Sequence, residues 1–155
     1  MTLRNRARLL RKLAAIQGAP RAAMRKALAQ NAAEITEMQK RLAPVDSGDL
    51  RDSIGFTFGK YRAANANVRG VAGGDGAGDP DLSVTIHAGD EKAFYAAFLE
   101  FGAAGPWQVG GRFAGATHPG FSAEPYFYPA WRALRRRSKS RLTRAMRKAI
   151  KDAAQ

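Results

Sequence analysis

Helical periodicity at both ends of this 155-residue chain is the feature that most constrains its fold. In the N-terminal part, apolar residues and one Asn recur in steps of three and four, which places them on one helix face. That stripe consists of Met24, Leu28, Asn31, Ile35, Met38 and Leu42. We expect this helix to end near Ala43, because Pro44 disfavours helical geometry in the residue before it. A shorter basic helix is predicted over residues 3–16, and Gly18 and Pro20 should separate the two helices.

The C-terminal helix is predicted from about Pro129 to Lys151. Its stripe consists of Trp131, Leu134, Ser138, Leu142, Ala145, Met146, Ala149 and Ile150. Lys and Arg cover its other faces. Proline is tolerated in the first turn of a helix, so Pro125 and Pro129 should bracket the start of this one.

Alternating residues between these two helices predict strands. Residues 53–59 and residues 82–88 both alternate as half-buried strands do, and a weaker strand is predicted around Val68 and Val71. A short helix should span residues 94–101.

Glycine and acidic residues mark the connecting segments. Gly102 should stop the short helix. Before the first strand, Ser47 or Asp46 should cap a short helical turn. The Gly-rich segment 70–80 is predicted to be a mobile loop, and the segment 102–120 an extended loop. Ordered loops of that length usually carry contacts, so we expect both to reach neighbouring subunits or an adjoining ring.

These patterns predict an α+β fold, in which a small curved antiparallel β-sheet packs with a long N-terminal helix, a short middle helix and a C-terminal helix. We expect a single domain over 1–155. It divides into a basic helical arm at 1–43, an α+β core at 44–130 and a basic helix at 131–155. The side chains expected to pack together in the core are Phe98, Phe101, Phe127 and Trp131.

The net charge of +13 is unevenly distributed. Residues 1–43 carry ten Lys and Arg against two Glu, and residues 126–155 carry ten against one Asp. The segment between them carries six against ten acids. Basic arms can bind phosphates, acidic protein surfaces or anionic lipid. Direct DNA contact and docking on an acidic partner both stay open. Membrane binding is disfavoured, because Ala makes the N-terminal helix's apolar face shallow.

The sequence offers little catalytic or cofactor chemistry. Cysteine is absent, which excludes disulfides and Cys-based sites. His87 is interpreted as structural or exposed. His118 and Glu100 are a candidate acid–base pair, but no nucleophile stands nearby in sequence. No phosphate loop or dinucleotide fingerprint is present. The acids that could hold a hard cation lack calcium-loop spacing; they are Asp75, Asp79, Asp81 and Asp90. We therefore expect no enzyme, no metal and no cofactor.

An aromatic cluster precedes the strongest basic run. The aromatic residues are Tyr126, Phe127, Tyr128 and Trp131, and the basic residues are Arg135, Arg136, Arg137, Lys139 and Arg141. Aromatic and cationic side chains together can bind single-stranded nucleic acid. The favoured interpretation is that the aromatic rings pack on the sheet while the charges face water. The five basic residues remain candidates for contact with DNA or a partner protein.

Three sequence blocks resemble the neck and tail-completion proteins of siphophages, a gene-product-ten-like family of tail components. The blocks lie at 44–54, 95–102 and 118–131. Their motif residues are Asp46, Ser47, Gly48, Leu50, Ile54, Tyr95, Phe98, Glu100, Phe101, Gly102, His118, Pro119, Gly120, Phe121, Pro125, Phe127, Pro129 and Trp131.

The resemblance implies a structural virion protein at the head–tail junction, made in the bacterial host cytoplasm. Its implied partners are other copies of itself in a hexameric ring, a connector or stopper protein, the tail tube protein and the double-stranded DNA in the channel. No membrane is implied. A phage and a gene transfer agent would use the same part. The alternative is a small basic DNA-binding protein whose arms coat nucleic acid.

Overall fold

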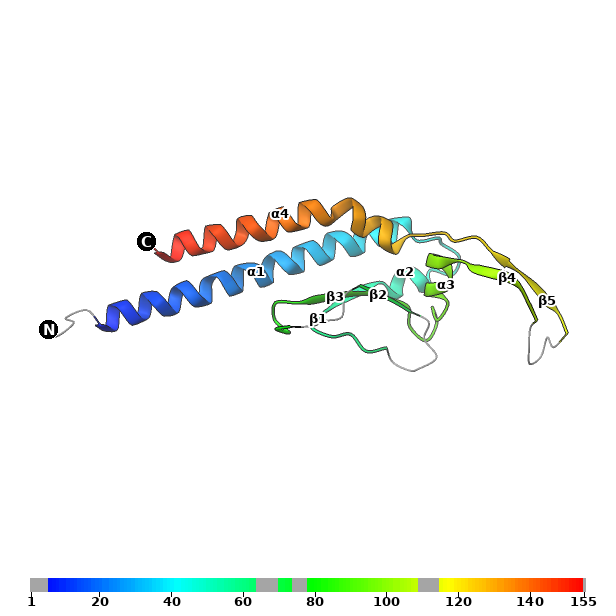
Figure 1. Ribbon diagram of the computed structural model, residues 1–155, viewed down its shortest axis with the longest axis horizontal. Coiled ribbons are helices and arrows are strands. Elements are labelled where there is room, and N and C mark those ends of the chain that lie inside the picture. The colour runs from blue at the N-terminus through cyan, green and yellow to red at the C-terminus, as the bar shows by residue number, and fades with distance from the viewer. Residues whose placement is uncertain (1–5, 64–69, 74–77, 109–114, 155) are drawn as a thin grey trace.

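The computed structural model describes residues 6–63, 70–73, 78–108 and 115–154 (Figure 1). In chain order the elements are α1 (Arg6–Leu42), α2 (Asp49–Ser53), β1 (Gly55–Phe58), β2 (Val71–Gly73), β3 (Val84–Ala88), α3 (Ala96–Phe101), β4 (Ala103–Gln108), β5 (Thr117–Phe121) and α4 (Phe127–Ala154). Helices flank two small antiparallel sheets, so the α+β prediction is confirmed.

The long helices α1 and α4 run side by side in opposite directions and form the spine of the molecule (Figure 1). Buried polar contacts fix their register: the Asn31 amide donates to the Ser138 carbonyl at 3.1 Å, and the Gln39 amide donates to the Phe127 carbonyl at 3.2 Å. The predicted end of α1 near Ala43 and the predicted extent of α4 are confirmed.

The predicted break in the N-terminal helix is wrong. Helix α1 continues through Gly18 and Pro20 without interruption. A proline inside a helix removes one backbone hydrogen bond and crowds the preceding turn. Here the helix continues on both sides of Pro20 despite that cost. The presence of Gly18 and Pro20 therefore does not determine the conformation of this segment.

The three-stranded sheet has the order β1-β3-β2 and lies beneath α1 (Figure 1). Phe56 pairs with Ile86, and Phe58 pairs with Val84. These four side chains share the face that turns toward the helices, because directly paired residues point to the same side of a sheet. The predicted strands at 53–59 and 82–88 are confirmed. Val71 lies in β2, whereas Val68 lies outside the described residues.

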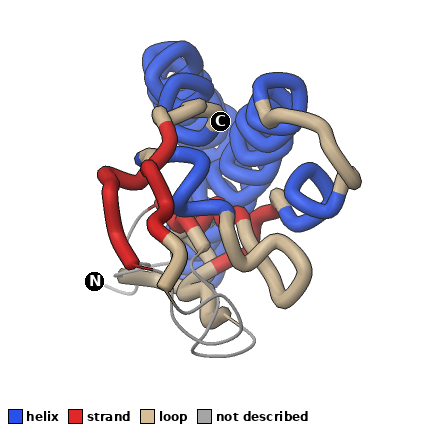
Figure 2. Tube along the Cα trace, turned by 90° about the vertical axis from the view of Figure 1, so that its right-hand side faces the viewer, coloured by secondary structure: helices blue, strands red, loops and turns tan. Residues whose placement is uncertain are grey.

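Residues 102–120 do not form the extended loop that was predicted. They contain β4 and β5, which pair as a second sheet and project from the body as an arm (Figures 1 and 2). Glycine is needed here because the backbones of the two strands lie very close together. A Cβ on Gly120 would lie 2.5 Å from the backbone N of Gly105 on the opposite strand, and Gly120 has a φ of +87°. The single curved sheet expected from the sequence is therefore two sheets.

The hydrophobic core lies where the sheet, α3 and the start of α4 meet. Its buried members are Ala43, Leu50, Ile54, Val71, Ala88, Ala93, Ala96, Tyr126 and Phe127. Of the four aromatic residues expected there, only Phe127 is buried. Phe98, Phe101 and Trp131 are 42%, 63% and 43% exposed. Alanine fills four of the nine buried positions, so small side chains make up much of this core.

Candidate assembly interface

Glu100 joins α3 to the start of α4. Its side chain is 4% exposed, and its carboxylate accepts backbone N–H groups from Tyr126, Phe127 and Tyr128 at 2.8, 2.7 and 3.0 Å. The first N–H groups of a helix lack partners within the helix and carry a partial positive charge. An ionised carboxylate satisfies both needs. The one acid in the motif Tyr95–Gly102 therefore caps α4, and both of its oxygens are occupied by this role.

Tyr126 also holds α3 against the start of α4. Its ring is buried, and its hydroxyl donates to the Ala96 carbonyl at 3.5 Å. Burial raises the pKa of the Tyr126 phenol, and the nearby Glu100 charge raises it further. The predicted packing of the 95–101 helix against the 126–131 segment is confirmed. Glu100, Tyr126 and Phe127 make the buried part of the contact, and the exposed ring of Phe101 lies against Tyr128 with centroids 6.0 Å apart.

Three phenylalanines form an exposed stripe at α3. Phe98 and Phe101 lie three residues apart on α3, and Phe94 lies in the turn just before it. Phe94, Phe98 and Phe101 are 52%, 42% and 63% exposed. Phe121, at the base of the arm, is also exposed. We call these four residues the Phe stripe. Large apolar patches on a protein surface mark contact sites, so the Phe stripe is the first candidate interface.

The arm begins beside the Phe stripe. Gly102 ends α3 as predicted, with a φ of +70°, and Ala103 then pairs with Phe121. A Cβ on Gly102 would lie 2.8 Å from the backbone N of Ala123, so this close turn requires glycine. His118 Nδ1 accepts the N–H of Gly120 at 3.0 Å, which places His118 and Pro119 on β5 as part of the arm.

The first two motif blocks meet at a surface depression. Its lining residues are Pro44, Val45, Asp46, Gly48, Leu50, Tyr95 and Leu99. Gly48 precedes α2 in a left-handed conformation and has no side chain to cap that helix. Ser47 Oγ accepts the N–H of Asp49, the first residue of α2, at 3.4 Å and donates to Asp49 Oδ2 at 2.5 Å, so the predicted contact of Ser47 with the start of this turn is present. Ile54 is buried in the same hydrophobic core as Leu50.

The acids considered as cation ligands have other roles. Asp79 and Asp81 form ion pairs with Arg21 and Arg25 on α1. The pKa of Asp79 is lowered by the N–H of Asp81 and then by Arg21. Asp90 Oδ1 accepts backbone N–H groups at the turn before α3. Asp75 lies outside the described residues. Among the residues that the structure describes, no group of three acids or histidines is placed to hold a metal.

His87, interpreted from the sequence as structural or exposed, lies in β3. Its ring stacks on Tyr61 with centroids 3.8 Å apart, on the face of the sheet away from the helices. It is half-buried, and the burial lowers its pKa. His87 Nδ1 has no hydrogen-bond partner in the described part of the chain.

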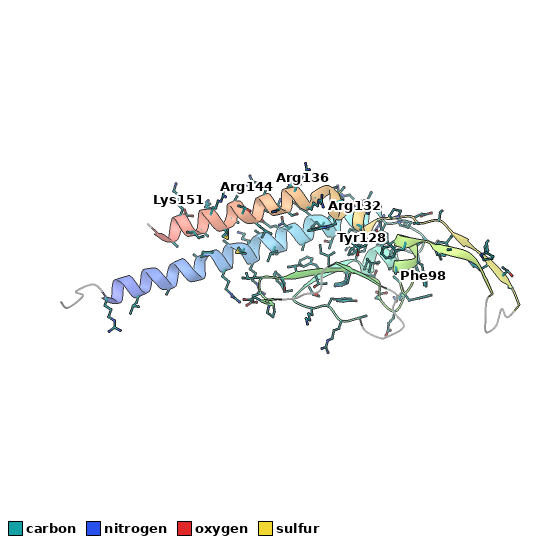
Figure 3. The ribbon with its side chains drawn as sticks, in the orientation of Figure 1. Phe98, Tyr128, Arg132, Arg136, Arg144 and Lys151 are labelled. Carbon is teal, nitrogen blue, oxygen red and sulfur yellow. The ribbon has the colours of Figure 1, made fainter. Side chains whose placement is uncertain are left out.

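The basic run on α4 divides into two groups. Arg141 bonds Asn31 and Glu34, at 2.6 and 2.5 Å, and Arg137 also pairs with Glu34. The hydrogen bond from Arg141 lowers the pKa of Glu34. Arg135, Arg136 and Lys139 instead line a groove between α1, α4 and β3. The run therefore both holds the helix pair together and exposes charge (Figure 3).

Sequence reasoning missed the capping role of Glu100, the arm and the groove. A lone acid inside the apolar segment 95–101, followed by Pro125 just before a helix, was the available signal for the cap. Nothing in the sequence indicated the groove, because its residues come from three separate elements. Within the described residues, no helix is both long and apolar enough to span a bilayer.

Comparison with known proteins gives one match. The protein-family model described as "Bacteriophage HK97-gp10, putative tail-component" matches residues 7–102. No curated protein and no solved structure matches the chain. The match extends further toward the N-terminus than the resembling blocks and stops at Gly102, so the third block lies outside it. Because more than half of the chain is covered, the chain belongs to the HK97-gp10-like family of bacteriophage tail components, which are structural proteins of the virion.

Proposed function

We propose that this tail component forms a hexameric ring at the head–tail junction, around the channel through which DNA passes. The observation that carries the proposal is the β4–β5 arm. It projects from the body beside the Phe stripe, at the end of the molecule away from the chain termini (Figure 1).

A projecting two-stranded arm needs a partner surface. An isolated hairpin is at best marginally stable in water. In the described part of the chain, β4 and β5 pair only with each other, so both outer edges of the arm are unpaired. Unpaired edges are templates for pairing with another chain. We infer that the arm lies on a neighbouring subunit.

The Phe stripe supports the same contact. An arm that docks on a different surface of the next copy makes a head-to-tail interface, and such interfaces close into rings when the rotation is suitable. The Phe stripe lies at the root of the arm, so one neighbour can cover both. The number of subunits comes from the family resemblance.

Charge supports a fixed orientation in the ring. Asp49, Asp52, Asp90 and Glu91 gather with Lys92 around one surface depression. The basic helices α1 and α4 lie on other parts of the surface. If the basic helix of a neighbouring subunit faces this depression, the opposite charges would fix the relative position of the two subunits more than they would strengthen their association.

In this proposal the neighbouring components are a connector or stopper protein on the head side and the tail tube protein on the other. The assembled particle is a phage or a gene transfer agent, and this chain lies in the neck between its head and its tail. We assign the motif residues to the scaffold that holds α3, the arm and the start of α4 together. Glu100 is the central contact of that scaffold.

Removal of the arm tests the proposal. Residues 104–120 are deleted and Ala103 is joined to Phe121 through Asn-Gly, a sequence that favours tight hairpin turns. Ala103 and Phe121 are register partners, so a short link can close the gap. We expect the variant to fold but to leave heads and tails unjoined when it replaces the normal chain. Normal numbers of infectious or DNA-transferring particles would contradict the proposal.

The second candidate function is DNA binding, favoured by the exposed cations along α4, among them Arg132, Arg136, Arg144 and Lys151 (Figure 3). Gel filtration with light scattering, with and without duplex DNA, separates the two functions. A ring that forms without DNA supports the first. A monomer whose DNA binding falls steeply with salt supports the second.

A further inference from the structure

A groove runs between α1, α4 and β3. Its volume is about 590 Å³, within the size range of protein binding sites. The lining residues are Leu28, Asn31, Ala32, Ile35, Val84, Ile86, Trp131, Arg135, Arg136, Ser138, Lys139 and Leu142. Most of this surface is apolar. A smaller depression shares Ile35, Val84, Ile86 and Trp131 with the groove and extends it toward Gln39 and Phe127.

The charged side chains of the groove are all basic. Arg135, Arg136 and Lys139 are exposed, and no acid is among the described residues that line it. Glu34, the acid on the facing part of α1, pairs with Arg137 and Arg141. The groove therefore combines an apolar floor with a cationic rim.

Trp131 gives a further indication that the groove binds a partner. It is 43% exposed on the groove wall, although a tryptophan ring gains much from burial.

We propose that this groove binds an acidic amphipathic segment of another virion protein. Apolar side chains of the segment cover Trp131, Val84 and Ile86. Its carboxylates meet Arg135 and Lys139 at the rim. Exposed tryptophan and arginine around an apolar floor are the composition of binding hot spots.

Charge complementarity and the apolar floor together select this occupant. Duplex DNA would neutralise the rim but leave the apolar floor uncovered. A second copy of the chain is a poorer fit, because the acids beside its exposed rings, Asp90 and Glu91 next to Phe94, belong to the surface that the proposed ring already covers. On that premise, which rests on the proposed function, the acidic segment comes from a different protein.

A fluorescein-labelled peptide of about 15 residues, with Leu on one face and Glu on the other, is the probe. Its anisotropy is measured on titration with the full chain. We expect saturable binding that weakens about tenfold in Arg135→Gln/Lys139→Gln. Trp131→Ala should weaken it as well. The matched control, Arg132→Gln/Arg144→Gln, removes two exposed charges from the same helix outside the groove and should bind as the unchanged chain does.

Several results would overturn the inference. They are no binding of the peptide, equal weakening by the two charge variants, and a 20-base-pair duplex (roughly two turns) that displaces the peptide. Self-association lost specifically in Arg135→Gln/Lys139→Gln would assign the groove to a second copy instead. The groove is formed by α1, α4 and β3, whereas the arm is formed by β4 and β5. Peptide binding should therefore persist in the variant that lacks residues 104–120. Failure of the ring and failure of this site are therefore separate results.

Discussion

At the scale of single residues, the structure depends on a few polar groups placed where backbone ends would otherwise be unsatisfied. Glu100 is the clearest case, because one carboxylate serves three N–H groups of a buried helix start. Such bonds to a charged acceptor are stronger than neutral ones. Asn31 and Gln39 have a different role and fix the register of the long helices, since each amide donates to a carbonyl of α4.

Glu100→Ala should lower the free energy of unfolding by about 2–3 kcal/mol, because it leaves buried N–H groups without an acceptor. Glu100→Gln should cost less, since an amide oxygen still accepts. Urea denaturation followed by circular dichroism measures both. Glu37→Ala, at an exposed position of α1, is the control and should change stability by no more than about 0.5 kcal/mol. Equal costs at positions 37 and 100 would refute the capping role.

His87 should make stability depend on pH. Burial lowers its folded-state pKa below the unfolded value of about 6.5. The unfolded chain therefore takes up the proton first as pH falls, and this contribution to stability is lost from about pH 7 downward. His87→Phe keeps a ring against Tyr61 and should flatten the stability profile between about pH 7 and pH 5. His118→Gln is the comparison variant, and an identical profile for His87→Phe and the unchanged chain would show the idea to be wrong.

At the scale of elements, the sequence predicted most of the helices and strands. Long periodic stripes mark α1 and α4, and alternation marks β1 and β3, because each pattern reflects one buried face. The failures share one cause. Pro20 and Gly120 disfavour regular structure by their intrinsic preferences. In the structure, Pro20 lies inside a continuous helix, and Gly120 allows β4 and β5 to approach closely.

The core residues show the same limit. Four aromatic residues of the motif were equally apolar in sequence, and only their three-dimensional neighbours separate buried Phe127 from exposed Phe98, Phe101 and Trp131. Glu100 was named as a motif residue, but its role needed the position of the α4 start. Phe98 and Phe101 of the Phe stripe were thus named from the sequence as core residues, and only the structure shows that they are exposed.

Phe127→Ala should destabilise the isolated chain by about 3–5 kcal/mol, as loss of a buried aromatic ring does. Phe101→Ala should leave stability within about 0.5 kcal/mol, because the ring is largely exposed. The same Phe101→Ala change should weaken subunit association. Thermal denaturation of monomer and sedimentation of the assembled form measure the two effects. A large loss of monomer stability in Phe101→Ala would mean that the Phe stripe belongs to the core.

At the scale of the whole molecule, the chain is an elongated helical spine with a small sheet beneath it and an arm at one end (Figure 1). Family membership makes it a structural tail component. The arm and Phe stripe are suited to contacts between copies, and the groove is suited to a different protein. A ring built this way would bury apolar surface that a single chain leaves exposed.

Cryo-electron microscopy of assembled particles tests the ring most directly. We expect a closed ring of copies of the 16.8 kDa chain between head and tail, with each arm on the next subunit and the Phe stripe covered. A reconstruction that places the chain as a single copy, or spreads it along the tail tube with the arm in solvent, would contradict the account.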